Sequence, residues 1–273
     1  MCHHCCIETV KKRMLSRRQF FGAAAATTAA IALAPSVEAR SLTVTEAKPV
    51  DLTHELYPDF PTYFGEPQLT VTPAFTFAAD GFNGNTWTLA EHTGTHMDAP
   101  LHFSEDGQSV AEVPIGHLVV PLSVIDIRDK AAGDPDAQVT PDDITAWKAQ
   151  NGPLPDGGCV AMNSGWDAHV ATAKFRNAGS DGTMHFPGFH LETAQMLMEE
   201  STTIGIGVDT LSLDYGPSGD FATHYAWLPT NRWGLEALAN LGALPAAGAT
   251  LIVGAPKVRV GTGGPCRVFA LAA

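Results

Sequence analysis

Runs of apolar and β-branched residues divide this chain into eight segments that we predict to be β-strands. Val, Ile, Leu and Thr dominate these runs, and glycine, proline or short polar residues bound most of them. Strands outnumber the helical signals, which favours an α/β fold rich in β-structure over a regularly alternating one. The predicted strands are residues 49–56, 68–78, 85–91, 118–127, 158–162, 203–208, 250–256 and 267–271.

Helical signals occur in three places. The clearest begins after Thr140, whose hydroxyl can cap a helix, and Pro141 suits the first helical position. Residues 191–200 show an apolar stripe at helical spacing, which predicts a helix that covers a sheet. Residues 235–241 predict a third, short helix. Because no repeat or linker-like segment follows the N-terminal region, residues 40–273 are expected to form one domain.

Four side chains that can bind a metal or carry a proton lie close together in the sequence His92-Thr-Gly-Thr-His96-Met-Asp98-Ala-Pro-Leu-His102. Imidazole nitrogen and carboxylate oxygen are donors that a borderline divalent cation prefers, and no cysteine stands nearby to indicate a closed structural zinc site. This run therefore predicts a hydrolytic metal site with an open coordination position.

All four residues occupy even positions, so an extended segment would direct their side chains toward one face. A helix would instead place Asp98 and His102 far around the cylinder from the other two. Gly94 and Pro100 also disfavour a helix here. We therefore predict that the run follows the end of a strand, residues 86–91, and continues as a rigid loop.

The first 39 residues differ in composition from the rest of the chain. A charged start ends in Ser16-Arg-Arg-Gln-Phe-Phe21, an alanine-rich apolar stretch covers residues 22–34, and the small residue Ala39 follows. This order resembles a twin-arginine signal peptide, so we expect periplasmic export and cleavage after Ala39. The apolar stretch is shorter than the roughly 20 residues that span a bilayer, so no stable membrane association is expected after cleavage.

The formal net charge of −13 makes nucleic acids and anionic membranes poor partners, because binding either usually requires a basic patch. Cys2, Cys5 and Cys6 lie in the leader and lack a following pair at zinc-site spacing. Cys159 and Cys266 lie in apolar, strand-like runs. We expect two buried free thiols there, although an oxidising compartment would allow the two to pair.

Further candidate ligands follow downstream at Asp209, Asp214, His224 and Glu236. Proline and glycine interrupt the chain between the last two, so a loop can return Glu236 toward His224. The predicted helix over residues 235–241 would hold Glu236 in its first turn, where the helix dipole favours a carboxylate. Together with the first run, His224 and Glu236 give three imidazoles and two carboxylates, enough for one or two metal ions.

Residues 92–102 agree at every specified position with His-x-Gly-Thr-His-x-Asp-x-Pro-x-His, the hallmark of the metal-dependent cyclase-like hydrolases. The chain resembles this family, which includes bacterial kynurenine formamidase (arylformamidase) and isatin hydrolase. The similarity covers most of the chain after the leader, through His224 and residues 186–189, 205–212, 236–241 and 261–267.

The resemblance implies a swivelling β/β/α domain, a homodimer or homotetramer, and one or two zinc or manganese ions per chain. It assigns His102 the role of catalytic acid/base. The predicted activity is hydrolysis of a small amide, formamide or lactam, in which metal-activated water attacks the carbonyl and His102 protonates the leaving nitrogen. The metal ligands that it implies are His92, His96, Asp98, His224 and Glu236.

Other functions are compatible with parts of this pattern. An exported lactone or ester hydrolase would use the same residues. A two-histidine, one-carboxylate iron site of an oxygenase could use His96, Asp98 and His224, but the other three candidates would then have no role. A non-catalytic metal-binding protein would not need a proton carrier. The substrate also stays open, because kynurenine formamidase serves tryptophan catabolism, which is usually intracellular, whereas residues 1–39 resemble an export signal.

Three other residues carry smaller expectations. Trp87 and Phe103 flank it and are candidates for the wall of a pocket for an aromatic substrate, although core packing would explain them as well. His190 stands where the family usually has a small capping residue, and we expect it at the surface rather than in the pocket.

Overall fold

The structure is a computed structural model that describes residues 48–272. The predicted leader, residues 1–39, therefore lies outside the described residues. Within the described range, no helix is both long and apolar enough to cross a membrane.

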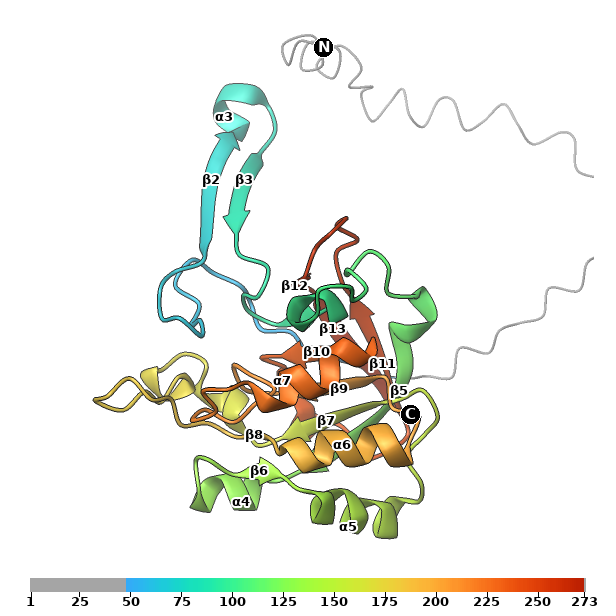
Figure 1. Ribbon diagram of the computed structural model, residues 1–273. Helices are drawn as coiled ribbons and strands as arrows, with labels where there is room; N and C mark the ends of the chain where they lie inside the picture. The colour runs from blue at the N-terminus through green and yellow to red at the C-terminus, as the bar shows by residue number, and fades with distance from the viewer. Residues whose placement is uncertain (1–47, 273) are drawn as a thin grey trace, which may run out of the picture. The chain divides into compact units, whose positions relative to one another are not determined.

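A mixed nine-stranded sheet forms the body of the molecule (Figure 1). Its four central strands, β5, β7, β9 and β10, run parallel to one another, and antiparallel strands extend the sheet on both sides. The order across the sheet is β1 (Lys48–Asp51), β13 (Arg267–Ala272), β11 (Ala249–Gly254), β5 (Val119–Asp126), β7 (Cys159–Asn163), β9 (Gly205–Val208), β10 (Trp233–Glu236), β4 (His96–Asp98) and β12 (Gly263–Pro265).

All eight predicted strands are present within a few residues of their expected bounds. Five further strands of the described chain are not predicted from the sequence. They are β4, β10, β12 and the parallel pair β6 (Gln138–Val139) and β8 (Gly188–Phe189). Each has only two to four residues. Such short segments hold too few positions for a period of two to emerge from the sequence.

Two of the predicted helices are confirmed, α5 (Pro141–Asn151) and α6 (Leu191–Glu200). Thr140 and Asp143 form a capping box at the start of α5. The backbone N–H of Thr140 donates to Asp143 Oδ2 (2.7 Å), and the Thr140 side chain accepts from the backbone N–H of Asp143. These helices and α7 (Ala222–Trp227) contribute to a core on one face of the sheet. The other helical segments are α4 (Arg128–Gly133) and the 3-10 turns η1 (Pro100–Phe103), η2 (Ile115–His117), η3 (Trp166–His169), η4 (Ala173–Phe175), η5 (Leu228–Thr230) and η6 (Leu241–Ala243).

The other face of the sheet is curled around a second apolar core. Met97 of β4 belongs to the same buried cluster as Val268 of β13, although these strands lie near opposite ends of the strand order. A flat sheet would hold them several strand spacings apart, since neighbouring strands are about 4.8 Å apart. The curvature therefore lets one continuous core support β4, the strand that carries part of the hallmark run.

The predicted helix over residues 235–241 is wrong. Leu235 and Glu236 end strand β10, and the chain then turns through Ala237 and Asn240, which adopt positive φ. Leu235 is fully buried, and β10 pairs with β9 on one side and β4 on the other. Burial on both faces and pairing on both edges override the local helical signal of this segment.

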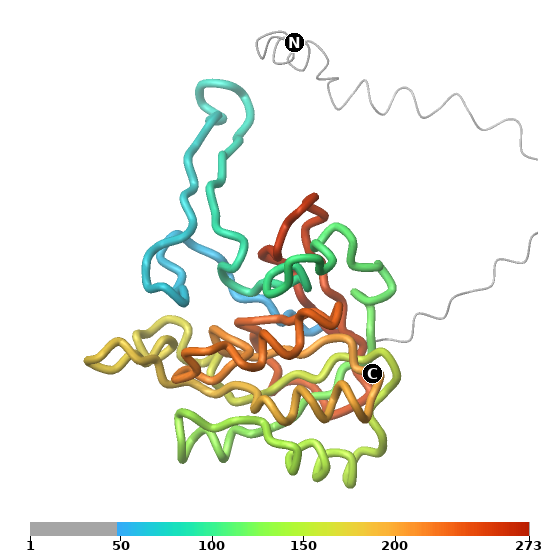
Figure 2. Tube along the Cα trace, viewed as in Figure 1, coloured from blue at the N-terminus to red at the C-terminus, as the bar shows by residue number. Residues whose placement is uncertain are grey.

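A β-hairpin projects from the body, with the short helix α3 (Phe77–Asp80) at its tip (Figures 1 and 2). Its strands are β2 (Leu69–Phe75) and β3 (Gly84–Leu89). Register pairs Val71 with Trp87 and Thr72 with Thr86, so apolar and threonine side chains occupy opposite faces. Val71 and Trp87 stay exposed, so nothing in the described chain covers the apolar face.

The two cysteines of the described chain, Cys159 and Cys266, are free and buried, as expected. Burial raises the pKa of Cys159, and burial together with the charge of Asp98 raises the pKa of Cys266 to about 12. Both thiols therefore pack as small apolar side chains rather than as reactive groups.

Candidate metal centre and active site

Strand register brings three of the predicted ligands together. Glu236 of β10 lies directly opposite His96 of β4, and Gly234 lies opposite Asp98. Opposed residues in an antiparallel pair point to the same face, as do residues two apart in one strand. His96, Asp98 and Glu236 therefore share a face, and Glu236 Oε2 lies 3.4 Å from His96 Nε2.

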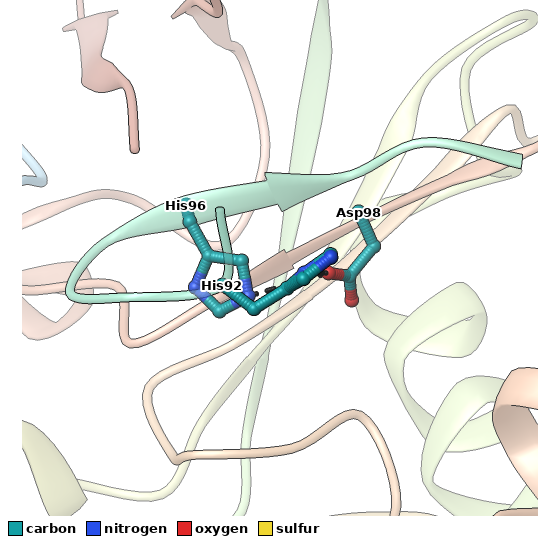
Figure 3. Close-up of side chains that lie close together, drawn as sticks. All are labelled: His92, His96 and Asp98. Carbon is teal, nitrogen blue, oxygen red and sulfur yellow. Dashed lines mark hydrogen bonds and ion pairs between the residues drawn. The ribbon is translucent and has the colours of Figure 1, made fainter. Parts of the chain in front are cut away.

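His92 joins this group from the turn between β3 and β4. Its Nδ1 lies 2.7 Å from Asp98 Oδ1, and His96 Nε2 lies 3.2 Å from the same oxygen (Figure 3). Gly94 permits the turn because its φ is 69°. Gly263 of β12 makes room for the ring, since a Cβ there would lie 2.8 Å from His92 Cε1.

His224 reaches the same centre from α7. Its Nε2 lies 3.1 Å from Glu236 Oε1 and 3.6 Å from Asp98 Oδ2. Its Nδ1 is 2.6 Å from Asp214 Oδ2. Asp214 is held in turn by the backbone N–H of Thr223 and by the Ser218 hydroxyl. Asp214 is thus an anchor for His224 rather than a ligand itself.

The ligand atoms form two overlapping groups that could each hold a metal ion. One contains His92, His96 and Asp98, the other contains Asp98, His224 and Glu236, and Asp98 belongs to both. The extended-strand prediction explains only His96 and Asp98, because His92 lies in a turn and His102 lies on η1. The five residues that the resemblance implies as ligands do converge at one site.

The donor chemistry of this site fits a divalent cation. His96 Nδ1 faces the carbonyl oxygen of Gly94 at 2.9 Å and His224 Nδ1 faces Asp214, so each ring donates its proton outward. Their Nε2 atoms then present lone pairs to the carboxylates of Asp98 and Glu236. Lone pairs on opposed nitrogen and oxygen atoms repel each other unless a cation or proton lies between them. Accordingly, His96 Nε2 and Asp98 Oδ2 are buried without a hydrogen-bond partner.

The electrostatic field at this centre attracts positive charge. Burial alone would lower the pKa of His96, but its 3.2 Å contact with Asp98 Oδ1 and the charges of Asp98 and Glu236 raise it to about 9. Burial would also raise the pKa of Asp98, but hydrogen bonds with the surrounding histidines hold it well below its usual value. Burial and the neighbouring Asp98 raise the pKa of Glu236. A field that favours protons on imidazole in this way also favours a metal cation.

His102 lies beside the ligands but is held differently. Its ring stacks on His92 with centroids 3.7 Å apart, and the described residues give its side chain no hydrogen-bond partner. Burial lowers the pKa of His102 to about 4, so the ring is neutral at neutral pH. A neutral imidazole with free nitrogen atoms can accept or donate a proton, as expected of an acid/base residue.

A cavity of about 370 Å³ opens directly over the metal centre. Its lining includes His92, His96, His102, His224 and Glu236. Four aromatic side chains share this lining, and they come from the loop before β2, from η1 and from the residue before α7. They are Tyr63, Phe64, Phe103 and Phe221.

The expectations for three other residues have clear outcomes. Phe103 lines the pocket as predicted, with its ring 4.7 Å from that of His224. Trp87 does not, because it lies on the projecting hairpin with 67% of its surface exposed. His190 caps helix α6, where its Nδ1 accepts from the backbone N–H of Glu192 at 3.2 Å, so it is a partly exposed capping residue rather than a pocket residue.

The residues that orient the ligands are not predictable from the sequence. The sequence marks Asp214 only as a candidate ligand and gives no reason to single out Glu91 or Thr262, although the Thr262 hydroxyl lies 3.0 Å from His92 Nε2. Asp209 is also not a ligand, because its carboxylate accepts from the backbone N–H groups of Ser164 and Trp166. These roles depend on contacts between distant segments, and the sequence carries no local signal for them.

Comparison with known proteins agrees with this geometry. A family model described as "Cyclase: Putative cyclase" matches residues 50–215. The isatin hydrolase of Roseibium aggregatum is 34% identical over 229 residues, which cover 80% of this chain and 85% of that protein. The kynurenine formamidase of Maricaulis maris is 28% identical, over 66% of this chain and 77% of that protein.

A solved isatin hydrolase bound to the product analogue thioisatinate has a similar fold. It is 33% identical to this chain and superimposes with a TM-score of 0.78. The match covers 83% of this chain and 93% of that one. The predicted β-rich α/β architecture is therefore confirmed.

Proposed function

This chain belongs to the cyclase family of metal-dependent hydrolases that cleave carbon–nitrogen bonds other than peptide bonds, and we propose that its substrate is a small aromatic lactam or formamide. The chain is similar to isatin hydrolase and kynurenine formamidase, and both of these enzymes are named after substrates of this type. The proposal rests on one observation above all: the metal centre forms the floor of an aromatic cavity.

The shape and chemistry of this cavity favour a flat aromatic substrate. The Phe103 ring lies 5.7 Å from that of Phe221, which in turn lies 5.7 Å from that of Tyr63. Aromatic side chains of this kind stack against planar substrates and exclude water. The reacting carbonyl would then face His96, Glu236 and His102 at the base of the cavity.

Different residues have different roles in the proposed hydrolysis. His102 is placed to remove a proton from the attacking water and to return it to the leaving nitrogen as the carbon–nitrogen bond breaks. One water is consumed, and a carboxylate and an amine result. His92 supports the His102 ring by stacking against it. Asp214 and the Gly94 carbonyl accept the outer N–H groups of His224 and His96, so the inner nitrogens are the ones that would bind the metal.

We propose zinc or manganese as the metal, one or two ions per chain, because the donors are imidazole and carboxylate. His92, His96, Asp98, His224 and Glu236 would hold it. When bound, such a cation acts as a Lewis acid on the carbonyl oxygen and makes water a stronger nucleophile near neutral pH.

The proposed function is tested by preparing the protein with zinc or manganese and assaying isatin, N-formylkynurenine and a simple lactone. We expect metal-dependent turnover of the lactam or the formamide, its loss with a chelator, and its recovery when the metal is restored. Turnover of the lactone alone would replace the proposal with an ester-type activity. A metal-loaded protein that hydrolyses none of the three would refute it.

We also propose that the protein is a homodimer or homotetramer, in which a second copy of the chain covers the apolar face of the β2–β3 hairpin. Val71 is 39% exposed and Trp87 67% exposed on this face. The body carries exposed apolar residues of its own at Ile115 and Val260. In a two-fold pair, each copy could cover apolar surface of the other, which is how most soluble oligomers close.

Replacing Trp87 with serine is expected to weaken self-association by about tenfold or more, because buried tryptophans dominate interface energies. Light scattering over a dilution series measures the change. Thr86→Ser alters the opposite face of the same hairpin and serves as the control. A monomeric wild-type protein, or equal association of wild type and Trp87→Ser, would contradict the proposal.

We further propose that the protein is exported to the periplasm. The support is the order of Arg17-Arg18, the apolar stretch 22–34 and Ala39 in the sequence. Cell fractionation of wild type and an Arg17→Lys, Arg18→Lys variant checks it. Cytoplasmic location of the wild type would contradict it.

A further inference from the structure

Each ligand histidine has an outer nitrogen that faces away from the metal centre. The hydrogen-bond partner of this outer nitrogen determines which of the two ring nitrogens carries the proton. For His96 the partner is the Gly94 carbonyl, and for His224 it is the Asp214 carboxylate. Both can only accept, so both rings must donate outward. For His92 the outer nitrogen is Nε2, and its partner is the Thr262 hydroxyl at 3.0 Å. A hydroxyl can either donate or accept, so by itself it leaves the state of His92 undecided.

Glu91 resolves this ambiguity. Its Oε2 lies 2.5 Å from Thr262 Oγ1 and accepts the backbone N–H of Thr262 at 3.2 Å. An ionised carboxylate can only accept, so the single hydroxyl proton of Thr262 points to Glu91. The hydroxyl oxygen then has only lone pairs to offer His92, whose Nε2 must carry the proton. In the neutral ring Nδ1 is then the nitrogen that can bind the metal. It lies 2.7 Å from Asp98 Oδ1, and a bound cation would take the place of a proton between these two atoms.

We propose that Glu91 and Thr262 are positioning residues that hold His92 as its Nε2–H tautomer, so that Nδ1 is kept free to bind the metal. This inference rests on the proposed metal-dependent function. It adds a two-residue relay to the five ligands, and the relay joins the segment before the hallmark to a loop 170 residues away in sequence.

His92 needs such a relay more than the other ligands do. Its side chain is 26% exposed, whereas those of His96 and His224 are only 5% and 4% exposed. Tight packing restricts the buried rings, but His92 has solvent on one side and the ring of His102 against it. A directed hydrogen bond therefore supplies the orientation that packing alone does not.

Three variants test the relay through metal affinity, measured by competition with a chromophoric chelator. Thr262→Val removes the acceptor, and Glu91→Leu frees the hydroxyl proton to turn toward His92. Both are expected to weaken zinc binding by about 10- to 100-fold, as the loss of outer hydrogen bonds to metal ligands usually does. Thr262→Ser keeps the hydroxyl and is expected to restore affinity to within about threefold of wild type. Circular dichroism confirms that each variant is folded.

The tautomer itself is read by NMR on the zinc-loaded protein with ¹⁵N-labelled histidine. We expect His92 to carry its proton on Nε2 in the wild type and in Thr262→Ser, and to lose this single form in Glu91→Leu. Equal affinity of Thr262→Val and wild type, or metal bound through His92 Nε2, would overturn the relay. A wild type that binds zinc but hydrolyses no substrate overturns only the proposed function. A wild type that binds no divalent cation overturns both.

Discussion

The His102→Ala variant is expected to keep its metal and to lose turnover by about 10²- to 10⁴-fold, the usual contribution of general acid–base catalysis. His102 lines the cavity, stacks on His92 and has no hydrogen-bond partner for its side chain among the described residues. It is absent from both groups of ligand atoms. Its loss therefore removes the proton carrier and leaves the donors in place.

Steady-state kinetics and elemental analysis on the same preparation separate these effects. His117→Ala is the matched control, because His117 lies on η2 and does not line the cavity. Turnover within about threefold of wild type would remove His102 from the mechanism. Loss of the metal in His102→Ala would instead make His102 a ligand.

The Asp98→Asn variant is expected to lose both the metal and the activity. Asp98 is 1% exposed and is shared by the two ligand groups. Asparagine keeps the shape but removes the charge, and its amide N–H₂ would face one of the imidazole nitrogens that now meet a carboxylate oxygen. We expect metal affinity to fall by more than about 100-fold. This loss is larger than the one that follows when a hydrogen bond to a metal ligand is removed.

Asp126→Asn is the matched control for this prediction. It removes one carboxylate from an exposed pair with Arg128, where a single ion pair contributes little. Calorimetric titration with zinc measures both variants against wild type. An Asp98→Asn protein that binds zinc as tightly as wild type would show that Asp98 is not a ligand.

Much of the fold follows from local sequence. Strands such as β5 and β11 are long apolar runs, and helix α5 begins with a capping box that needs only Thr140 and Asp143. These signals act within a few residues of each other, so they survive in the final structure. The short strands and the segment after Glu236 cannot be predicted from local signals, because pairing with distant strands decides their conformation.

The β2–β3 hairpin also shows what local sequence cannot predict. Alternation of Val71 and the neighbouring threonines correctly indicates a strand with one apolar face. It does not say where that face lies, and Trp87, a candidate for either a pocket wall or the core, is exposed on the hairpin. A period of two defines the two faces of a strand, but the tertiary structure decides what each face meets.

The sequence by itself determined the chemistry of this site: three imidazoles, two carboxylates and a further histidine, in types and spacings that suit a metal and a proton carrier. Tertiary structure decided their arrangement. The β4–β10 register sets Glu236 opposite His96, α7 delivers His224, and the loop with Thr262 orients His92. Residue type fixes what a side chain can bind, whereas strand pairing and chain reversal across more than a hundred residues fix which side chains meet.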